Sequence, residues 1–175
     1  AVRWFILSDS PPEKDVQWSD AGVVSSNKFL QKIWNLNQSI LSNTSKKVDK
    51  NKQKTFENKI EICVYKIDSS IKNFQFNVAI AQFYEIYRYI NETKSEINNE
   101  ILKNSMIKIM KLMIPFTPHI ANECLLILNC KDLNRWPKVD RSTIEKSKVK
   151  MVVQINGKTR DVIEIKRNLE ENEIT

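Results

Sequence analysis

Apolar side chains recur at spacings of three and four residues along most of the chain, with polar side chains between them. This period is typical of amphipathic helices. It predicts a mainly α protein: five helices between residue 19 and about residue 129, packed as an antiparallel up-down bundle. We expect one core, formed by Phe29, Ile33, Trp34, Ile60, Ile67, Ile80, Phe83, Met106, Ile109 and Met113.

Polar and proline-containing segments set the predicted helix ends. Two prolines at 11 and 12 predict a loop before the first helix, because proline does not fit a helix interior. Residues 42–55 are polar and lysine-rich, and they predict a mobile connection to the second helix. The expected helix starts are, in order, Ser19 or Asp20, Phe56, a helix capped near Asn77, Ser95 or Glu96, and Pro118.

A β-hairpin is predicted after the bundle, because the apolar period changes to two and Asn156-Gly157 is a hairpin turn signal. A two-residue loop would pair Met151 with Val162. A three-residue loop pairs Met151 with Ile163 and brings the apolar residues of both strands to one face. We therefore expect a three-residue loop with a bulge.

Composition narrows the possible functions. The 175 residues include only two glycines, Gly22 and Gly157, which excludes a glycine-rich phosphate loop. No apolar run approaches the roughly 20 residues of a membrane span. Three cysteines and one histidine do not have the spacing of a zinc site, so we expect no metal and reduced thiols in a cytoplasmic protein.

The single histidine, His119, directly follows Pro118 at a predicted helix start. A serine or cysteine nucleophile would require it as a base, and no second base accompanies it. We expect this side chain to hydrogen-bond the loop or to pair with Glu123 one turn further on. We therefore expect no catalytic residue in this chain.

The net charge of +7 is compatible with a nucleic-acid partner. Basic residues gather at 46–59 and 138–167. The second region includes the hairpin, whose lysines and arginines are spaced to follow phosphates, although lysine also protects sheet edges. The candidate RNA-binding residues are Lys158 and Arg160, with Lys148 and Lys150 in support. Contact between RNA and the first region stays open.

Five segments carry a family resemblance: residues 3–18 (RWFILSDSPPEKDVQW), 29–34 (FLQKIW), 76–81 (FNVAIA), 115–123 (PFTPHIANE) and 153–160 (VQINGKTR). Together they resemble the bacterial-type leucyl-tRNA synthetases, which are class I enzymes, in the region after their catalytic domain. The fourth segment is shared with related class I enzymes, whereas the first and fifth narrow the resemblance to leucine. Asn122 departs from the family's acidic residue, and Cys124-Leu125-Leu126 departs from its aromatic segment.

The resemblance implies four parts. Residues 1–19 would connect to the catalytic part of the parent, 20–130 would form the helical bundle of anticodon-binding type, 131–147 would be a linker, and 148–175 would begin the C-terminal tRNA-binding domain. The chain begins inside an apolar stretch without Met and stops in a charged segment. We expect it to be a piece of a longer protein.

The resemblance also implies a function. The chain would be the tRNA-binding portion of an enzyme that attaches leucine to tRNA(Leu), without a catalytic site or cofactor of its own. ATP, Mg²⁺ and leucine would be used by the parent. The expected partners are tRNA(Leu) and the catalytic domain of the same chain, with no membrane, no DNA and a monomeric state. The alternatives are a stand-alone helical RNA-binding or scaffold module and a small hydrolase, which would need a second base near His119.

Overall fold

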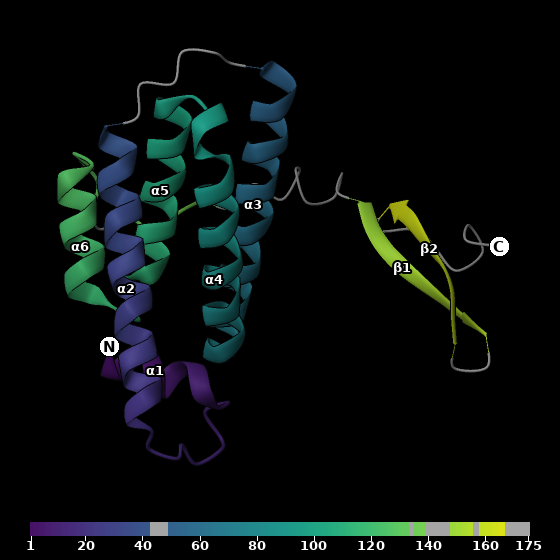
Figure 1. Ribbon diagram of the computed structural model, residues 1–175, viewed down its shortest axis with the longest axis horizontal. Coiled ribbons are helices and arrows are strands. Elements are labelled where there is room, and N and C mark those ends of the chain that lie inside the picture. The colour runs from purple at the N-terminus through teal and green to yellow at the C-terminus, as the bar shows by residue number, and fades with distance from the viewer. Residues whose placement is uncertain (43–48, 134, 139–147, 156–157, 167–175) are drawn as a thin grey trace. The chain divides into compact units, whose positions relative to one another are not determined.

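The computed structural model describes residues 1–42, 49–133, 135–138, 148–155 and 158–166. They belong to two units, 1–139 and 140–175. The first unit is helical, and its long helices run alternately up and down (Figure 1). Its elements are α1 (Val2–Asp9), α2 (Asp20–Leu41), α3 (Lys50–Lys72), α4 (Phe76–Thr93), a 3₁₀ turn (Lys94–Glu96), α5 (Asn99–Met113) and α6 (Pro118–Ile127).

The apolar stripes of the helices meet in one core, as the sequence predicts. Every predicted core residue except Trp34 is buried in this cluster, and Trp34 is half-buried and packs against it. The fifth predicted helix, α6, adds Cys124 to the same core, and its C-cap residue Leu128 is buried there as well. Within the described part of the chain, no helix is both long and apolar enough to cross a membrane.

Helix α1 was not predicted from the sequence, from which residues 1–19 were expected to be a connector. Trp4 is fully buried and belongs to the core of the bundle. Its ring lies 5.3 Å from that of Phe29, 5.7 Å from Phe83 and 6.0 Å from Phe116, measured between centroids. The start of the chain is therefore packed into the bundle through an aromatic cluster.

Two predicted helix starts are confirmed. The Ser19 hydroxyl accepts a hydrogen bond from the Gly22 amide at 3.1 Å, which is the expected cap of α2. Pro118 is the first residue of α6, where its missing N–H costs no helical hydrogen bond.

The other helix starts differ from the prediction. Helix α3 begins at Lys50 rather than Phe56, so residues 50–55 are helical and the predicted connection 42–55 is too long. Residues 43–48 of that connection lie outside the described residues. Helix α4 begins at Phe76, with Gln75 and not Asn77 at its N-cap. The fourth predicted helix, α5, begins later than expected, capped by Asn98, because residues 94–96 form a 3₁₀ turn.

The segment after α6 is non-helical at 135–138, as predicted. The buried carboxylate of Asp68 holds this segment to the bundle. The Trp136 indole donates a hydrogen bond to Asp68 on α3 at 2.8 Å. Lys72, one turn further along α3, donates to the other oxygen of Asp68 at 2.7 Å. The Asp68 side chain is 7% exposed, so two donors compensate the burial of its charge.

The second unit contains strands β1 (Lys148–Ile155) and β2 (Lys158–Lys166), paired antiparallel. Met151 pairs with Ile163, the register that the apolar pattern predicts. The predicted three-residue loop is wrong, because Ile155 already pairs with Lys158 and leaves only two residues between the strands. The extra residue is Arg160, which lies in β2 as a bulge between two paired positions.

Candidate nucleic-acid interface

The four predicted RNA-binding residues all lie on the hairpin, but they do not form one row. Lys148 and Lys150 are two residues apart on β1, at positions that share one face of the hairpin, and they pair with Lys166 and Glu164. Lys158 pairs with Ile155, an odd-numbered position of β1, and therefore lies at a position of the opposite face. Arg160 has no partner position on β1, and its side chain is exposed. The backbone register thus brings Lys148 and Lys150 together and separates them from Lys158.

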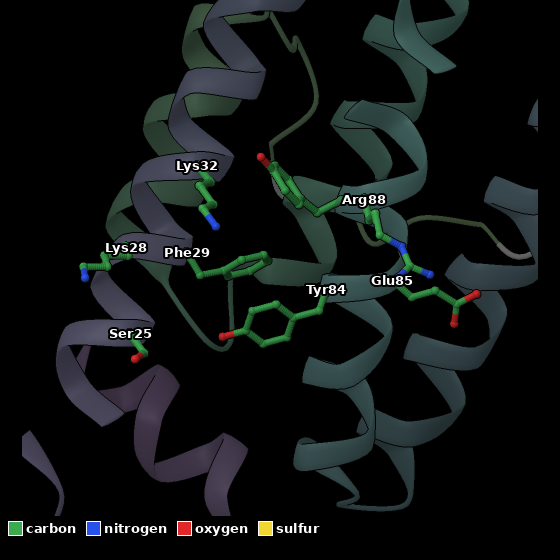
Figure 2. Close-up of a pocket in the computed structure, with 8 residues that line it drawn as sticks. Ser25, Lys28, Phe29, Lys32, Tyr84, Glu85 and Arg88 are labelled. Carbon is green, nitrogen blue, oxygen red and sulfur yellow. The ribbon is translucent and has the colours of Figure 1, made fainter. Parts of the chain in front are cut away.

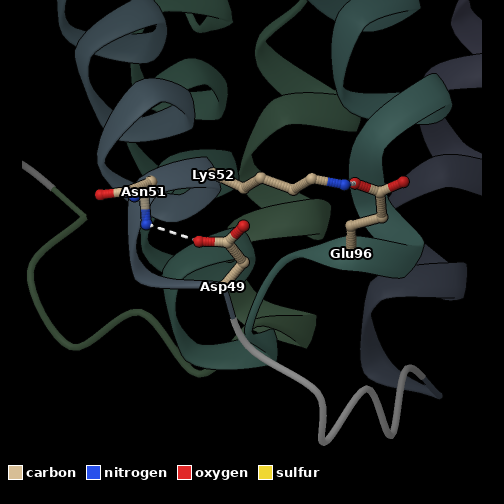
Figure 3. Close-up of polar contacts among 4 residues, drawn as sticks. All are labelled: Asp49, Asn51, Lys52 and Glu96. Atoms are coloured by element: carbon tan, nitrogen blue, oxygen red, sulfur yellow. Dashed lines mark hydrogen bonds and ion pairs between the residues drawn. The ribbon is translucent and has the colours of Figure 1, made fainter.

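The lysine-rich region 46–59 is, from Lys50 onward, the first turns of α3. Asp49 caps this helix by accepting a hydrogen bond from the Asn51 amide at 2.8 Å. Lys52 pairs with Glu96 at 2.5 Å, and this hydrogen bond raises the pKa of the Lys52 ammonium (Figure 3). Two of the region's lysines, Lys52 and Lys59, therefore already pair with acids of the bundle.

A groove between α2 and α4 combines cations with aromatic rings (Figure 2). Lys28 and Lys32 lie one turn apart on α2, and Arg88 lies across from them on α4. The groove has a volume of about 670 Å³. All three cationic side chains are exposed, and none of them makes an ion pair with another described residue.

The floor of the groove is aromatic. Phe29 is buried between α2 and α4, with its ring centroid 3.9 Å from that of Tyr84 and 5.6 Å from that of Tyr87. The Tyr84 hydroxyl accepts a hydrogen bond from the Trp4 indole at 3.3 Å. These contacts hold the Tyr84 ring, although the residue as a whole is 41% exposed.

Glu85 is the one acid that lines the groove, and it is already paired. Lys59 on α3 donates to its carboxylate at 2.7 Å. This hydrogen bond lowers the pKa of Glu85, and Arg88 makes a smaller contribution in the same direction. The groove therefore keeps an excess of positive charge.

The described residues offer no arrangement suited to catalysis or metal binding. No group of three or more His, Cys, Asp or Glu side chains is close enough to hold a metal ion in the described part. His119 is exposed in the first turn of α6, and neither of its expected contacts, with the loop or with Glu123, occurs among the described residues. Cys63 and Cys124 are buried and unbridged, and Cys130 is half-buried.

Comparison with known proteins shows the family of this chain. Residues 53–175 match the family described as the anticodon-binding domain of tRNA ligase. The chain belongs to this family. Its matched region includes α4, one wall of the groove, and both strands of the hairpin.

Relatives of this anticodon-binding domain are leucine–tRNA ligases. The chain is 35% identical over 180 residues to the one from Prochlorococcus marinus subsp. pastoris, covering 99% of this chain and 21% of that protein. It is 36% identical over 187 residues to the one from Thermosipho melanesiensis, covering 99% of this chain and 23% of that protein. The chain thus spans about a fifth of the length of these relatives.

A solved structure has the same fold. It is the crystal structure of the agnB2 LeuRS of Agrobacterium radiobacter K84 in a ternary complex with tRNA and LeuAMS. The TM-score is 0.77 at 23% sequence identity, and the match covers 99% of this chain and 24% of that chain.

The apolar pattern of the sequence does not predict the cationic groove of this anticodon-binding domain. The signal in the sequence was two lysines four residues apart that flank Phe29, and a tyrosine and an arginine at the same spacing in α4. Each pair alone describes an ordinary solvated helix face. Only the packing of α2 near α4 joins the two pairs around one aromatic floor.

Proposed function

We propose that this chain is the tRNA-binding portion of a leucyl-tRNA synthetase, the ATP-dependent enzyme that attaches leucine to tRNA(Leu). The observation that carries the proposal is the similarity of almost the whole chain to leucine–tRNA ligases, together with its membership of the anticodon-binding family. The positively charged hairpin and groove support an RNA partner. The stand-alone scaffold module has no comparable support.

The same proposal assigns the substrates of the parent enzyme to its catalytic domain and tRNA binding to this portion. ATP, Mg²⁺ and leucine are bound by the catalytic domain of the parent chain, and this portion activates no leucine by itself. The partners of this portion are tRNA(Leu) and that catalytic domain. A cytoplasmic location fits the buried, unbridged thiols of Cys63 and Cys124.

The hairpin is the proposed beginning of a C-terminal tRNA-binding domain, as the resemblance implies. Within it, Lys158 and Arg160 approach tRNA phosphates, and Lys148 and Lys150 support them. The exposed side chain of Arg160 favours this role. A bulge increases local twist and re-aims a side chain, so Arg160 is placed outside the regular rows of the strand.

The test uses the parent enzyme with Lys158→Ala and Arg160→Ala combined. The matched control is Lys14→Ala combined with Lys131→Ala, which removes two exposed positive charges from the helical unit. We expect weaker tRNA(Leu) binding and a salt slope that is shallower by about 1.4–1.8, with leucine activation unchanged. Unchanged tRNA affinity in the hairpin variant at low and physiological salt would reject the assignment of these residues.

A further inference from the structure

We propose that Asp68 and Trp136 are positioning residues for the binding of tRNA(Leu) by the parent enzyme. Their hydrogen bond holds residues 129–133 and 135–138, which we call the strap, to the bundle at α3. The strap thereby fixes the point on the bundle from which the chain continues to the hairpin. This inference rests on the proposed tRNA-binding function, and it adds no new contact with RNA.

The strap begins with an ordered turn at the end of α6. Asn129 has a φ of 54°, in the left-handed region. Its amide donates to the Leu126 carbonyl at 2.9 Å. The next amide, that of Cys130, donates to the Leu125 carbonyl at 3.0 Å. These two hydrogen bonds form the Schellman motif, which ends a helix and satisfies its last carbonyls. The chain therefore leaves α6 along a defined path.

Apolar contacts follow along the strap. Cys130 and Leu133 pack against the core of the bundle, and Pro137 is buried. Helix α5 packs against both α6 and α3, and the strap passes from the end of α6 to Asp68 on α3. Apolar burial is non-directional, so these contacts favour a strap that lies on the bundle without selecting one position for it.

Asp68 supplies the directional contact. Trp136 Nε1 lies 2.8 Å from one of its carboxylate oxygens, and Lys72 Nζ lies 2.7 Å from the other. The side chain of Asp68 is only 7% exposed, whereas that of Lys72 is 68% exposed and its charge is screened by solvent. Without the indole N–H, a buried charged acceptor would lack one of its two donors. This cost favours the single position of the strap in which Trp136 meets Asp68.

A strap held at Trp136 limits the reach of the hairpin. The chain from Lys138 to Lys148, the first residue of β1, spans at most about 35 Å. If the strap were released back to Cys130, the span to Lys148 would grow to at most about 60 Å. The effective concentration of one linked binding unit at the site of another falls roughly as the −3/2 power of the length between them. The strap therefore favours contact between the hairpin and a tRNA that the parent already holds.

The first measurement tests whether the hydrogen bond holds the strap. Trp136→Phe keeps an aromatic ring and removes the N–H donor. The matched control is Trp18→Phe, which removes an indole donor that also lies 2.8 Å from a carboxylate, that of Asp20, in an exposed pair outside the strap. Each 175-residue chain is digested briefly with trypsin under native conditions. Cleavage after Lys131, in the strap, is followed by mass spectrometry.

We expect cleavage after Lys131 to be about tenfold faster in Trp136→Phe, because the strap opens more often, and unchanged in Trp18→Phe. Position 131 is far enough from position 136 for trypsin to meet the same local sequence in each protein. Equal cleavage rates in all three proteins would overturn the role of the Asp68–Trp136 hydrogen bond.

The second measurement tests whether the strap positions the hairpin. It uses the parent enzyme with Trp136→Ala, which removes the ring as well as the donor. The substitution is made alone and together with Lys158→Ala and Arg160→Ala. We expect Trp136→Ala alone to weaken tRNA(Leu) binding about two- to threefold. It should have no further effect once the hairpin cations are absent, and leucine-dependent pyrophosphate exchange should stay unchanged.

Unchanged tRNA(Leu) affinity in Trp136→Ala would overturn the positioning role and leave the proposed function intact. An equal loss of affinity with and without the hairpin cations would overturn it too, because the strap would then act independently of the hairpin. Loss of leucine activation in Trp136→Ala would show a general disturbance of the enzyme and would also contradict the positioning role. If the unsubstituted parent does not bind tRNA(Leu), the positioning role and the proposed function both fail.

Discussion

Gly22 lies where the first turn of α2 meets the ring of Phe5. A Cβ atom at this position would lie 2.4 Å from Phe5 Cε2 and 2.7 Å from Phe5 Cδ2, well inside van der Waals contact. Phe5 is only 4% exposed and packs edge-on against Trp18 at a centroid distance of 5.9 Å. Its ring therefore has little room to move away.

We predict that Gly22→Ala destabilises the fold by up to about 2 kcal/mol in urea unfolding. Overpacking typically costs about 1–3 kcal/mol, and the gain of about 1 kcal/mol in helix propensity offsets part of it. In a Phe5→Leu background the same substitution should cost less, because the ring that it meets is absent. A stability increase on Gly22→Ala in the unsubstituted chain would contradict the close approach.

The buried thiols predict a pH dependence at alkaline pH. Burial raises the pKa of Cys63 to about 12 and that of Cys124 to about 11. An unfolded cysteine has a pKa of about 8.5. Between these values the unfolded chain loses the thiol proton while the folded chain keeps it, so stability falls as pH rises.

We predict that Cys63→Ala flattens this fall. Each thiol contributes a slope of up to about 1.4 kcal/mol per pH unit between about pH 9 and its folded pKa. Urea unfolding of the chain and of Cys63→Ala, followed from pH 8 to about pH 10.5, checks this difference. Parallel profiles would mean that Cys63 titrates in the folded protein as it does in the unfolded one.

At the scale of elements, the start of α3 depends on Asp49. Its side chain accepts from the Asn51 amide at 2.8 Å, while the nearby Lys52–Glu96 pair is exposed and screened by solvent (Figure 3). We predict that Asp49→Ala lowers the free energy of unfolding by about 1 kcal/mol and that Asp49→Asn, which keeps a capping oxygen, costs much less. Equal stabilities of the two variants by thermal or urea unfolding would show that the cap is unimportant.

Elements with a regular apolar stripe were predictable from the sequence. The cores of α2, α3, α4 and α5 follow from spacings of three and four, and the register of the hairpin follows from its period of two. Residues 50–55 were not predicted as helix because they lack apolar residues, although lysine and glutamine favour helices and Asp49 is a good cap. Periodicity reports the buried face, so it says little about a solvated first turn.

Helix α1 was not predicted because its residues have too many apolar side chains rather than too few. Its residues are apolar almost without interruption, so no stripe distinguishes a helix from a strand in residues 2–7. Its place is decided by long-range packing of Trp4 among Phe29, Phe83 and Phe116, which the local sequence does not encode. The position of the bulge at Arg160 was not predictable either. The apolar pattern shows that one residue of the hairpin must be left unpaired, but it does not show whether that residue lies in the loop or in a strand.

At the scale of the whole molecule, the family and the site were predictable to different degrees. Short motifs such as residues 153–160 are enough to predict the family from the sequence. The family match over residues 53–175 confirms this prediction. The cationic groove was not predictable, because Lys28, Lys32 and Arg88 come from helices that are far apart in sequence and meet only in the bundle. The RNA-binding roles of Lys158, Arg160, Lys148 and Lys150 stay predictions.

The most direct measurement is the equilibrium binding of the 175-residue chain to a tRNA(Leu) transcript over a series of salt concentrations. If the chain is the tRNA-binding portion of a ligase, binding is saturable at about 50 mM salt, and the logarithm of the affinity falls linearly with the logarithm of the salt concentration. Each neutralised phosphate adds roughly 0.7–0.9 to the slope. Absence of binding at about 50 mM salt, where electrostatic contacts are strong, would contradict the proposal that this chain binds tRNA(Leu).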